Sequence, residues 1–220
     1  MLTPTQTNDL IRFWLNQDRE HALFYALGFQ DAQLRAEAMR LHDDYARALA
    51  ADDLAAGMVV LERAQAFKLA ALARLKTGEW LGWIWPTFLQ HTFDELEMMR
   101  AKISRPVLPR AELCAIDRFN LEHLAFAAHL FDPSEKALQA ATTEAAAPAL
   151  ATANRCAADT YATLRDLSLR SGAAIDRLFT DVTSRTPPPA SIIHPALGAH
   201  VVREGRHWLD TMRSLPPISA

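Results

Sequence analysis

Two segments of the chain carry the same polar pattern, and the same dipeptide precedes each of them. The pattern Pro-x4-His-x3-Glu and its preceding Glu-His dipeptide occur twice, at Glu20-His21 with Pro86, His91 and Glu95, and at Glu122-His123 with Pro195, His200 and Glu204. The dipeptides lie 102 residues apart (20 to 122) and the longer motifs 109 apart (86 to 195). A chain of this composition should contain the longer motif about 0.02 times by chance. The repetition predicts two related halves, about 1–104 and 109–215, that pack as a single domain over residues 1–220.

The composition favours helices throughout. The chain has seven glycines, is rich in alanine and leucine and has few β-branched runs, which together predict an all-α fold. We expect helices at about 8–28, 30–50, 53–77, 86–103, 110–131, 137–153 and 195–214, the sixth interrupted at Pro148 because an interior proline removes a hydrogen bond. A further helix to about Arg170 should break at Ser171-Gly172. The four motif-bearing helices are expected to form a ferritin-like four-helix core with pseudo-twofold symmetry and extra helices around it.

The repeated residues are candidate metal ligands. Histidine and glutamate four residues apart share one helix face, and the histidines of the dipeptides would face them from other helices. The expected ligands are His21, His91, Glu95, His123, His200 and Glu204. Four imidazoles and two carboxylates suit iron, manganese or zinc, whereas magnesium and calcium prefer more oxygen. The set is sufficient for one six-coordinate ion closed by both halves or for two ions, and we favour iron or manganese.

Three further residues are candidates for the surroundings of the metal. Glu20 and Glu122 precede their histidines by one position, a rotation of about 100° on a helix, so only one member of each dipeptide can face the site directly. We favour glutamate as the group that supports the histidine, because a ligating imidazole usually needs a partner for its other nitrogen. His207 lies on the same helix face as His200 and Glu204 and is a candidate extra ligand or proton carrier.

Charge and hydropathy argue against several classes of protein. The formal net charge of −3 gives no electrostatic case for binding nucleic acid or an anionic membrane. No apolar run approaches the roughly 20 residues that a membrane span needs, and the N-terminus lacks the pattern of a signal peptide. The two cysteines, Cys114 and Cys156, form no CxxC motif. We expect them to be packing thiols of a reduced cytoplasmic protein, with one disulfide as the less favoured alternative.

Three of the five tryptophans fall within seven residues. Trp80, Trp83 and Trp85 lie between two expected helices, in segment 79–85. Large aromatic side chains usually fill hydrophobic cores. We therefore expect a packed loop whose tryptophans plug the core.

Four segments resemble a known family. RFWLNQDREHALF, RFNLEHLAF, WPTFLQHTFDE and HPALGAHVVREGRHWL are similar to motifs of an uncharacterised bacterial family of duplicated helical bundles, whose architecture is similar to that of ferritin-like and hemerythrin-like proteins. The resemblance implies iron or a similar metal between the helices, held by the six residues above. Arg206-His207 stands where the family tends to carry an aromatic pair. Ferritin-like enzymes carry Glu-x2-His where this chain has His-x3-Glu, so their activities are not transferred by analogy.

Three functions are compatible with the sequence. The first is a redox or oxygen-handling metalloprotein in which Glu20, Glu122 or His207 relays protons, which requires an open coordination position. The second is a non-enzymatic protein that the bound metal stabilises. The third is a metal-free interaction module that uses the same residues as a buried polar network.

Overall fold

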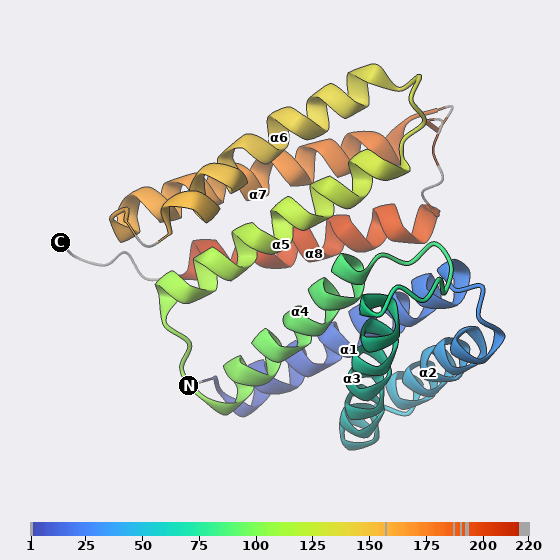
Figure 1. Ribbon diagram of the computed structural model, residues 1–220. Coiled ribbons are helices and arrows are strands. Elements are labelled where there is room, and N and C mark those ends of the chain that lie inside the picture. The colour runs from blue at the N-terminus through green and yellow to red at the C-terminus, as the bar shows by residue number, and fades with distance from the viewer. Residues whose placement is uncertain (1, 157, 187, 190, 192–193, 216–220) are drawn as a thin grey trace. The chain divides into compact units, whose positions relative to one another are not determined.

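The regular structure of the chain is helical. The computed structural model describes residues 2–156, 158–186, 188–189, 191 and 194–215, and none of these forms a β-strand (Figure 1). The helices of this part are α1 (Pro4–Gly28), α2 (Ala32–Ala50), α3 (Leu54–Lys76), α4 (Pro86–Ser104), α5 (Pro109–Leu130), α6 (Lys136–Arg155), α7 (Tyr161–Ser184) and α8 (Pro195–Ser214). The predicted all-α fold is confirmed.

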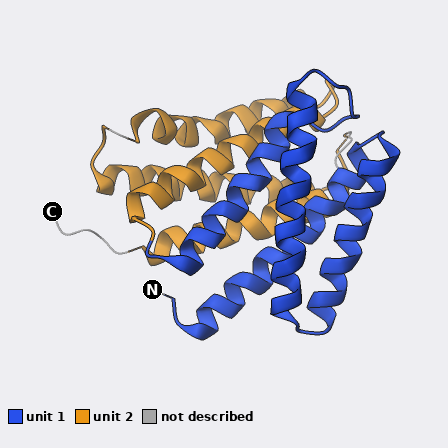
Figure 2. Ribbon diagram, turned by 60° about the horizontal axis from the view of Figure 1, so that its bottom comes forward, with its two compact units in different colours: residues 1–106 blue, residues 107–220 orange. Residues whose placement is uncertain are grey.

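The chain divides into two compact units. Unit 1 comprises residues 1–106 with α1 to α4, and unit 2 comprises residues 107–220 with α5 to α8 (Figure 2). The boundary falls in the gap between the two halves that the sequence predicts. Within each unit every helix packs on the next, and the first helix also contacts the third and the fourth. The first and last helices, which carry the repeated motifs, are therefore neighbours within each unit.

Two helices continue where the sequence predicts an interruption. Helix α6 runs through Pro148, and the hydroxyl of Thr152 donates a hydrogen bond to the carbonyl of Pro148 at 3.1 Å. Helix α7 runs through Gly172, where an added Cβ would lie 2.8 Å from Cε of Met212 in α8. The glycine therefore permits close packing of α7 on α8. The predicted breaks at Pro148 and at Ser171-Gly172 are wrong because helix packing outweighs the local preference.

The loop between α3 and α4 is fastened to the end of α1 by backbone hydrogen bonds. The amide of Gln30 donates to the carbonyl of Leu81, and the amide of Trp83 donates to the carbonyl of Gly28, both at 2.8 Å. Gly82 lies between these bonds with φ +133°, and a Cβ there would lie 2.3 Å from the carbonyl oxygen of Gly28. The close approach therefore requires glycine.

The same loop exposes two of its tryptophans. Leu81 and Ile84 are buried, whereas Trp80 is 68% and Trp83 76% exposed. Trp85 is half-buried. The prediction that all three plug the core is wrong, because the backbone anchoring of the loop turns Leu81 and Ile84 inward instead.

The two cysteines are paired. Cys114 and Cys156 form a disulfide with their Cα atoms 6.0 Å apart, within the usual range of about 4.4–6.8 Å. Helices α5 and α6 pack against each other, and this packing brings the first turns of α5 beside the end of α6. The expectation of two separate thiols is therefore wrong. Their separation of 42 residues gives no sign of the contact.

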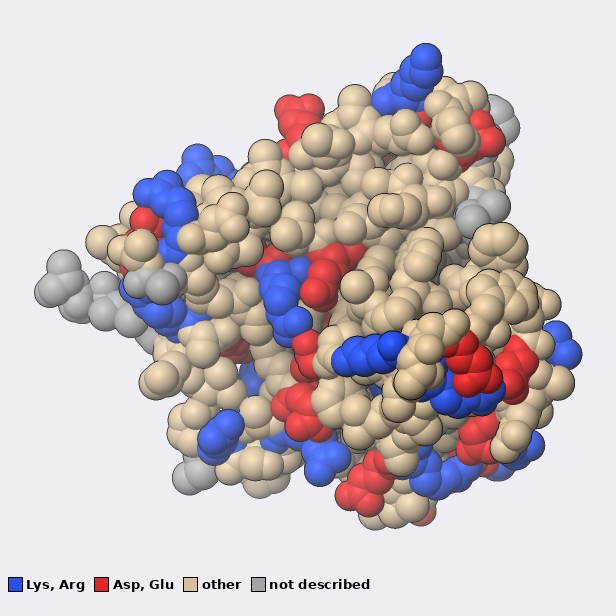
Figure 3. All heavy atoms as spheres, in the orientation of Figure 1, with Lys and Arg blue, Asp and Glu red and all other residues tan. Residues whose placement is uncertain are grey.

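The described residues contain no helix that is both long and apolar enough to cross a membrane. On the face drawn in Figure 3, acidic and basic side chains lie among one another. Many of the basic side chains form ion pairs with acidic neighbours within one helix turn, as Arg40 does with Glu37 and Arg170 with Asp166. Such exposed pairs contribute little to stability.

Unit 2 buries a carboxyl group among hydroxyls. Asp117 in α5 is fully buried, and the hydroxyl of Ser168 in α7 donates a hydrogen bond to its Oδ2. Burial raises the pKa of Asp117 to about 7, although the hydrogen bond from Ser168 favours the ionised form. The folded protein therefore retains a proton here that the unfolded chain, with an aspartate pKa of about 3.9, loses at lower pH.

We predict that Gly82→Ala lowers the free energy of unfolding by about 1–3 kcal/mol, because a side chain at positive φ is strained and its Cβ would contact the backbone of Gly28 and Gln30. Urea denaturation measures the change. Gly78→Ala is the matched control, because Gly78 also has positive φ but no atom within 4 Å of the added Cβ. Equal losses in the two variants would contradict the role assigned to the close approach.

We also predict that Asp117 reduces stability as the pH rises from about 4 to about 7. A folded pKa above the unfolded value means that the folded state binds the extra proton, so stability falls as that proton is lost. The difference in unfolding free energy between Asp117→Asn and the wild type should therefore grow in favour of the variant over this range. Urea denaturation at several pH values measures it, and parallel pH profiles for the two proteins would contradict the prediction.

Candidate functional site

Each unit places two histidines and one glutamate of the repeated motifs together. The unit 1 triad consists of His21 from α1 with His91 and Glu95 from α4, and the unit 2 triad consists of His123 from α5 with His200 and Glu204 from α8. All six side chains are buried, with at most 5% exposed. Helices α4 and α8 both begin at a proline, which is favoured in the first helical turn. The four-residue spacing then puts each histidine beside its glutamate.

In the unit 1 triad, Glu95 lies between two imidazoles. Its Oε1 is 2.9 Å from Nε2 of His91, and its Oε2 is 3.8 Å from Nε2 of His21. Glu95 itself is fully buried. The ring of His21 packs edge-on against Phe88, with centroids 6.2 Å apart.

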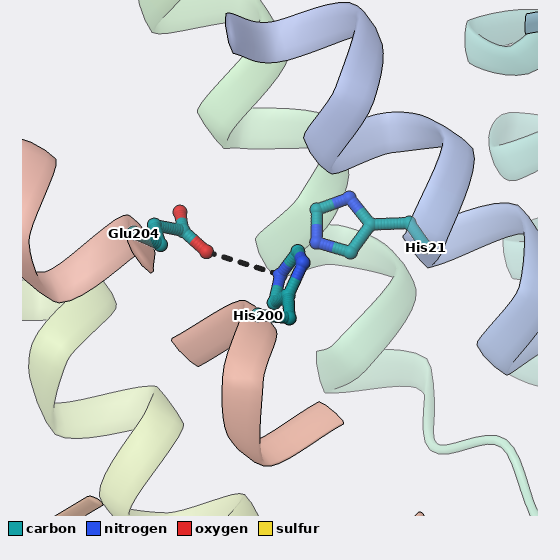
Figure 4. Close-up of side chains that lie close together, drawn as sticks. All are labelled: His21, His200 and Glu204. Atoms are coloured by element: carbon teal, nitrogen blue, oxygen red, sulfur yellow. Dashed lines mark ion pairs between the residues drawn. The ribbon is translucent and has the colours of Figure 1, made fainter. Parts of the chain in front are cut away.

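The unit 2 triad repeats this arrangement around Glu204. The Oε2 of Glu204 is 3.2 Å from Nε2 of His200, as drawn in Figure 4, and 3.5 Å from Nε2 of His123. The indole of Trp208 donates a hydrogen bond to the other oxygen at 3.3 Å. Burial raises the pKa of Glu204, but the two histidines outweigh it and hold that pKa well below its usual range. The carboxylate is therefore ionised.

These distances fit metal coordination. Two ligand atoms that bind one ion at tetrahedral or octahedral angles lie about 2.8–3.6 Å from each other, given the usual metal–ligand bond lengths. Three of the four nitrogen–oxygen distances fall in this range, and the fourth, from His21 to Glu95, is 3.8 Å. The six buried side chains are thus His and Glu residues that could hold metal ions in a helical bundle.

A buried ion pair contacts the Nδ1 side of the His21 ring. The Oδ1 of Asp18, one turn earlier on α1, is 3.3 Å from Nδ1 of His21 and 2.5 Å from Nζ of Lys68 in α3. Tyr45 in α2 donates to the other oxygen of Asp18 at 2.5 Å, and Lys68 also donates to the backbone carbonyl of Thr92 in α4 at 3.1 Å. Asp18 and Lys68 are each 1% exposed. All four helices of unit 1 therefore contribute to this network.

The network keeps Asp18 ionised. Burial raises the pKa of Asp18, but the charge of Lys68 and the hydrogen bonds from His21 and Lys68 outweigh it, so the pKa lies well below its usual range. Burial likewise lowers the pKa of Lys68, and the charge of Asp18 opposes that change. Neither Asp18 nor Lys68 is among the residues that the sequence pattern predicts. The sequence offers two indications of this pair: Lys68 lies in the apolar stretch of α3, and Asp18 precedes His21 by three residues. Neither residue belongs to the repeated pattern.

Glu20, Glu122 and His207, the candidates for the surroundings of the metal, make none of the histidine–glutamate contacts given above for the two triads. Glu20 is half-buried with Arg19 at 3.9 Å, and Glu122 is half-buried with Arg118 at 3.7 Å. His207 packs its ring against Trp208, with centroids 5.1 Å apart. Their roles near a metal stay predictions.

Comparison with known proteins gives relatives without a stated function. No known family profile matches the chain. Over 155 residues it is 24% identical to the uncharacterised protein L567 of Acanthamoeba polyphaga mimivirus, a match that covers 58% of this chain and 48%, about half, of that protein. Its fold is similar to the crystal structure of an uncharacterised protein from Bacillus cereus G9241, with a TM-score of 0.84 and 15% identity over 97% of this chain and 93% of the other. The chain is thus homologous to the mimivirus protein and shares its fold with the Bacillus protein.

Proposed function

We propose that the protein binds transition-metal ions through His21, His91, Glu95, His123, His200 and Glu204. The observation that carries the proposal is the complete burial of Glu95 and Glu204, each within 4 Å of two imidazole nitrogens of its own unit. A buried carboxylate is costly unless a cation compensates its charge. The neighbouring histidines are metal ligands by type, so a bound metal ion satisfies both requirements.

The mixture of ligands indicates the kind of metal. Each triad offers two nitrogens and one oxygen, which suits iron or manganese and also zinc. Three protein ligands leave coordination positions for water or another small molecule. Iron or manganese would supply redox or oxygen chemistry at such a position, and Glu20, Glu122 and His207 are the proposed proton carriers. We propose one or two bound ions, and the ratio of metal to protein measures which number is correct.

We also propose that the two units arose by internal duplication and form a single domain with a ferritin-like core. The repeated motifs support this, and so does a pair of isolated backbone bridges, Phe29 with Gly82 and Phe131 with Ser191. The bridge residues are offset by 102 (29 to 131) and 109 (82 to 191), the same offsets as the dipeptides and the longer motifs.

A metal-free polar network is the second candidate function for the same residues. The Nε2 of His91 and the Oε1 of Glu95 lie 2.9 Å apart, within hydrogen-bonding distance, so the same residues are compatible with a structural or interaction module. The cellular location of the protein does not distinguish the two candidate functions.

A cytoplasmic location stays a prediction. The disulfide between Cys114 and Cys156 weighs against a reducing compartment.

We predict that His91→Ala and His200→Ala each abolish tight metal binding, because each removes a buried ligand. Elemental analysis of purified, untagged protein against protein concentration measures the metal content. His42→Ala is the control, because His42 bonds the backbone carbonyl of Arg19 and belongs to neither triad. Equal metal content in all three variants would refute the ligand set, and a wild type that retains no metal after reconstitution would favour the polar network.

We further predict that metal stabilises the protein. Ligand at about 100 times its dissociation constant adds about 2.7 kcal/mol to the unfolding free energy, which raises the Tm of a chain of this size by about 5–10 °C. Thermal unfolding of chelator-treated protein with and without added Mn²⁺, Fe²⁺ or Zn²⁺ measures the shift. His42→Ala should keep the shift and His200→Ala should lose it. An unchanged Tm in the wild type with all three metals would count against metal binding.

A further inference from the structure

We propose that Asp18 is a positioning residue that fixes the tautomer and orientation of His21, and that it makes His21 a stronger metal ligand than its counterpart His123. The affinity part of this inference rests on the proposed metal binding. The positioning part concerns the metal-free protein and is tested separately.

The geometry at His21 defines which nitrogen is available. The Oδ1 of Asp18 lies 3.3 Å from Nδ1 of His21, while Nε2 of the same ring points to Glu95 at 3.8 Å. An ionised carboxylate accepts hydrogen bonds and cannot donate them. Asp18 is ion-paired with Lys68 at 2.5 Å and so acts as the acceptor. In a neutral His21 ring the proton therefore sits on Nδ1, which leaves the lone pair of Nε2 directed toward Glu95 and available to a metal ion.

Asp18 is itself held from three directions. Lys68 and His21 approach one of its oxygens, and Tyr45 donates to the other. Lys68 is in turn fixed by the backbone carbonyl of Thr92, on the helix that carries the other two residues of the unit 1 triad. A ligand whose supporting partner is locked in this way is preorganised for binding. A carboxylate behind an imidazole also makes the ligating nitrogen more basic.

Unit 2 has a neutral residue at the position that corresponds to Asp18. The residue three positions before His123 is Asn120, which is fully buried, and neither atom of its amide has a hydrogen-bond partner among the described residues. A neutral amide carries no charge to strengthen the imidazole. The two triads therefore contain the same ligand types, but only His21 has an anionic partner one turn earlier on its helix.

The competing explanation is that the Asp18–Lys68 pair serves only to hold the helices of unit 1 together. Under that explanation, substitution changes stability and leaves the tautomer of His21 and the metal affinity unchanged. Asp18→Asn alone would leave Lys68 charged and buried without its partner, which is strongly destabilising. An asparagine would also still offer an acceptor oxygen to Nδ1 of His21. The test therefore uses the double variant Asp18→Leu/Lys68→Met, and Asn120→Asp to introduce a carboxylate in unit 2.

Two measurements decide the matter in the full chain. The first is ¹⁵N NMR of the histidine rings in metal-free protein, which reports the tautomer of each imidazole. The second is a Zn²⁺ titration in competition with a chromophoric chelator. Asp117→Asn is the matched control, because Asp117 is a buried aspartate whose carboxylate is hydrogen-bonded to Ser168.

We expect the Nδ1–H tautomer at His21 in the wild type and its loss in the double variant. The affinity of the tightest zinc site should fall about 10–100-fold in the double variant and stay unchanged in Asp117→Asn. In Asn120→Asp, the zinc affinity of the site that contains His123 should rise. An Nε2–H tautomer at His21 in the wild type, or zinc affinity that is equal in the wild type and the double variant, would overturn the inference. A wild type that binds no zinc would refute the proposed function and the affinity claim together, while the NMR result still decides whether Asp18 positions His21.

Discussion

The arrangement of unit 1 depends on one buried ion pair. Asp18 and Lys68 are removed from water, and such a pair is tolerated only when its remaining hydrogen-bonding capacity is satisfied. Tyr45 and the backbone of Thr92 complete that requirement, so groups from all four helices must reach the same point. A buried polar network is costly when it is only partly satisfied. Lys68 thus links Asp18 on α1 to the backbone of Thr92 on α4, the two helices that carry His21 and Glu95.

Unit 2 reaches the corresponding arrangement with different side chains. Its first helix carries Asn120 in place of an aspartate, and its buried aspartate, Asp117, accepts a hydrogen bond from the hydroxyl of Ser168. The contact between α5 and α8 is made by aromatic packing, with the rings of Phe119 and Trp208 stacked at 6.0 Å, and the same Trp208 donates to Glu204. The two glutamates thus meet the same pair of histidines in different electrostatic surroundings.

The triads are difficult to explain by stability alone. Well-packed apolar residues would usually serve a helical core as well as a buried His–Glu cluster or better. Places where a chain breaks the rules of good packing are commonly functional. Two such clusters, each on the first and last helix of a unit, are the features of the fold that stability explains least. The helices around them supply the burial that makes an uncompensated carboxylate costly.

The sequence by itself determined the helical class, most helix positions and the motif positions, because helix periodicity and the four-residue spacing act within a single element. Tertiary packing decided the rest. It carried α6 through Pro148 and α7 through Gly172, paired Cys114 with Cys156, and exposed Trp80 and Trp83. It also brought Lys68 to Asp18 across 50 residues. Periodicity identifies which face of a helix is buried but not which neighbour covers it, so contacts between distant elements appear only when the helices are packed.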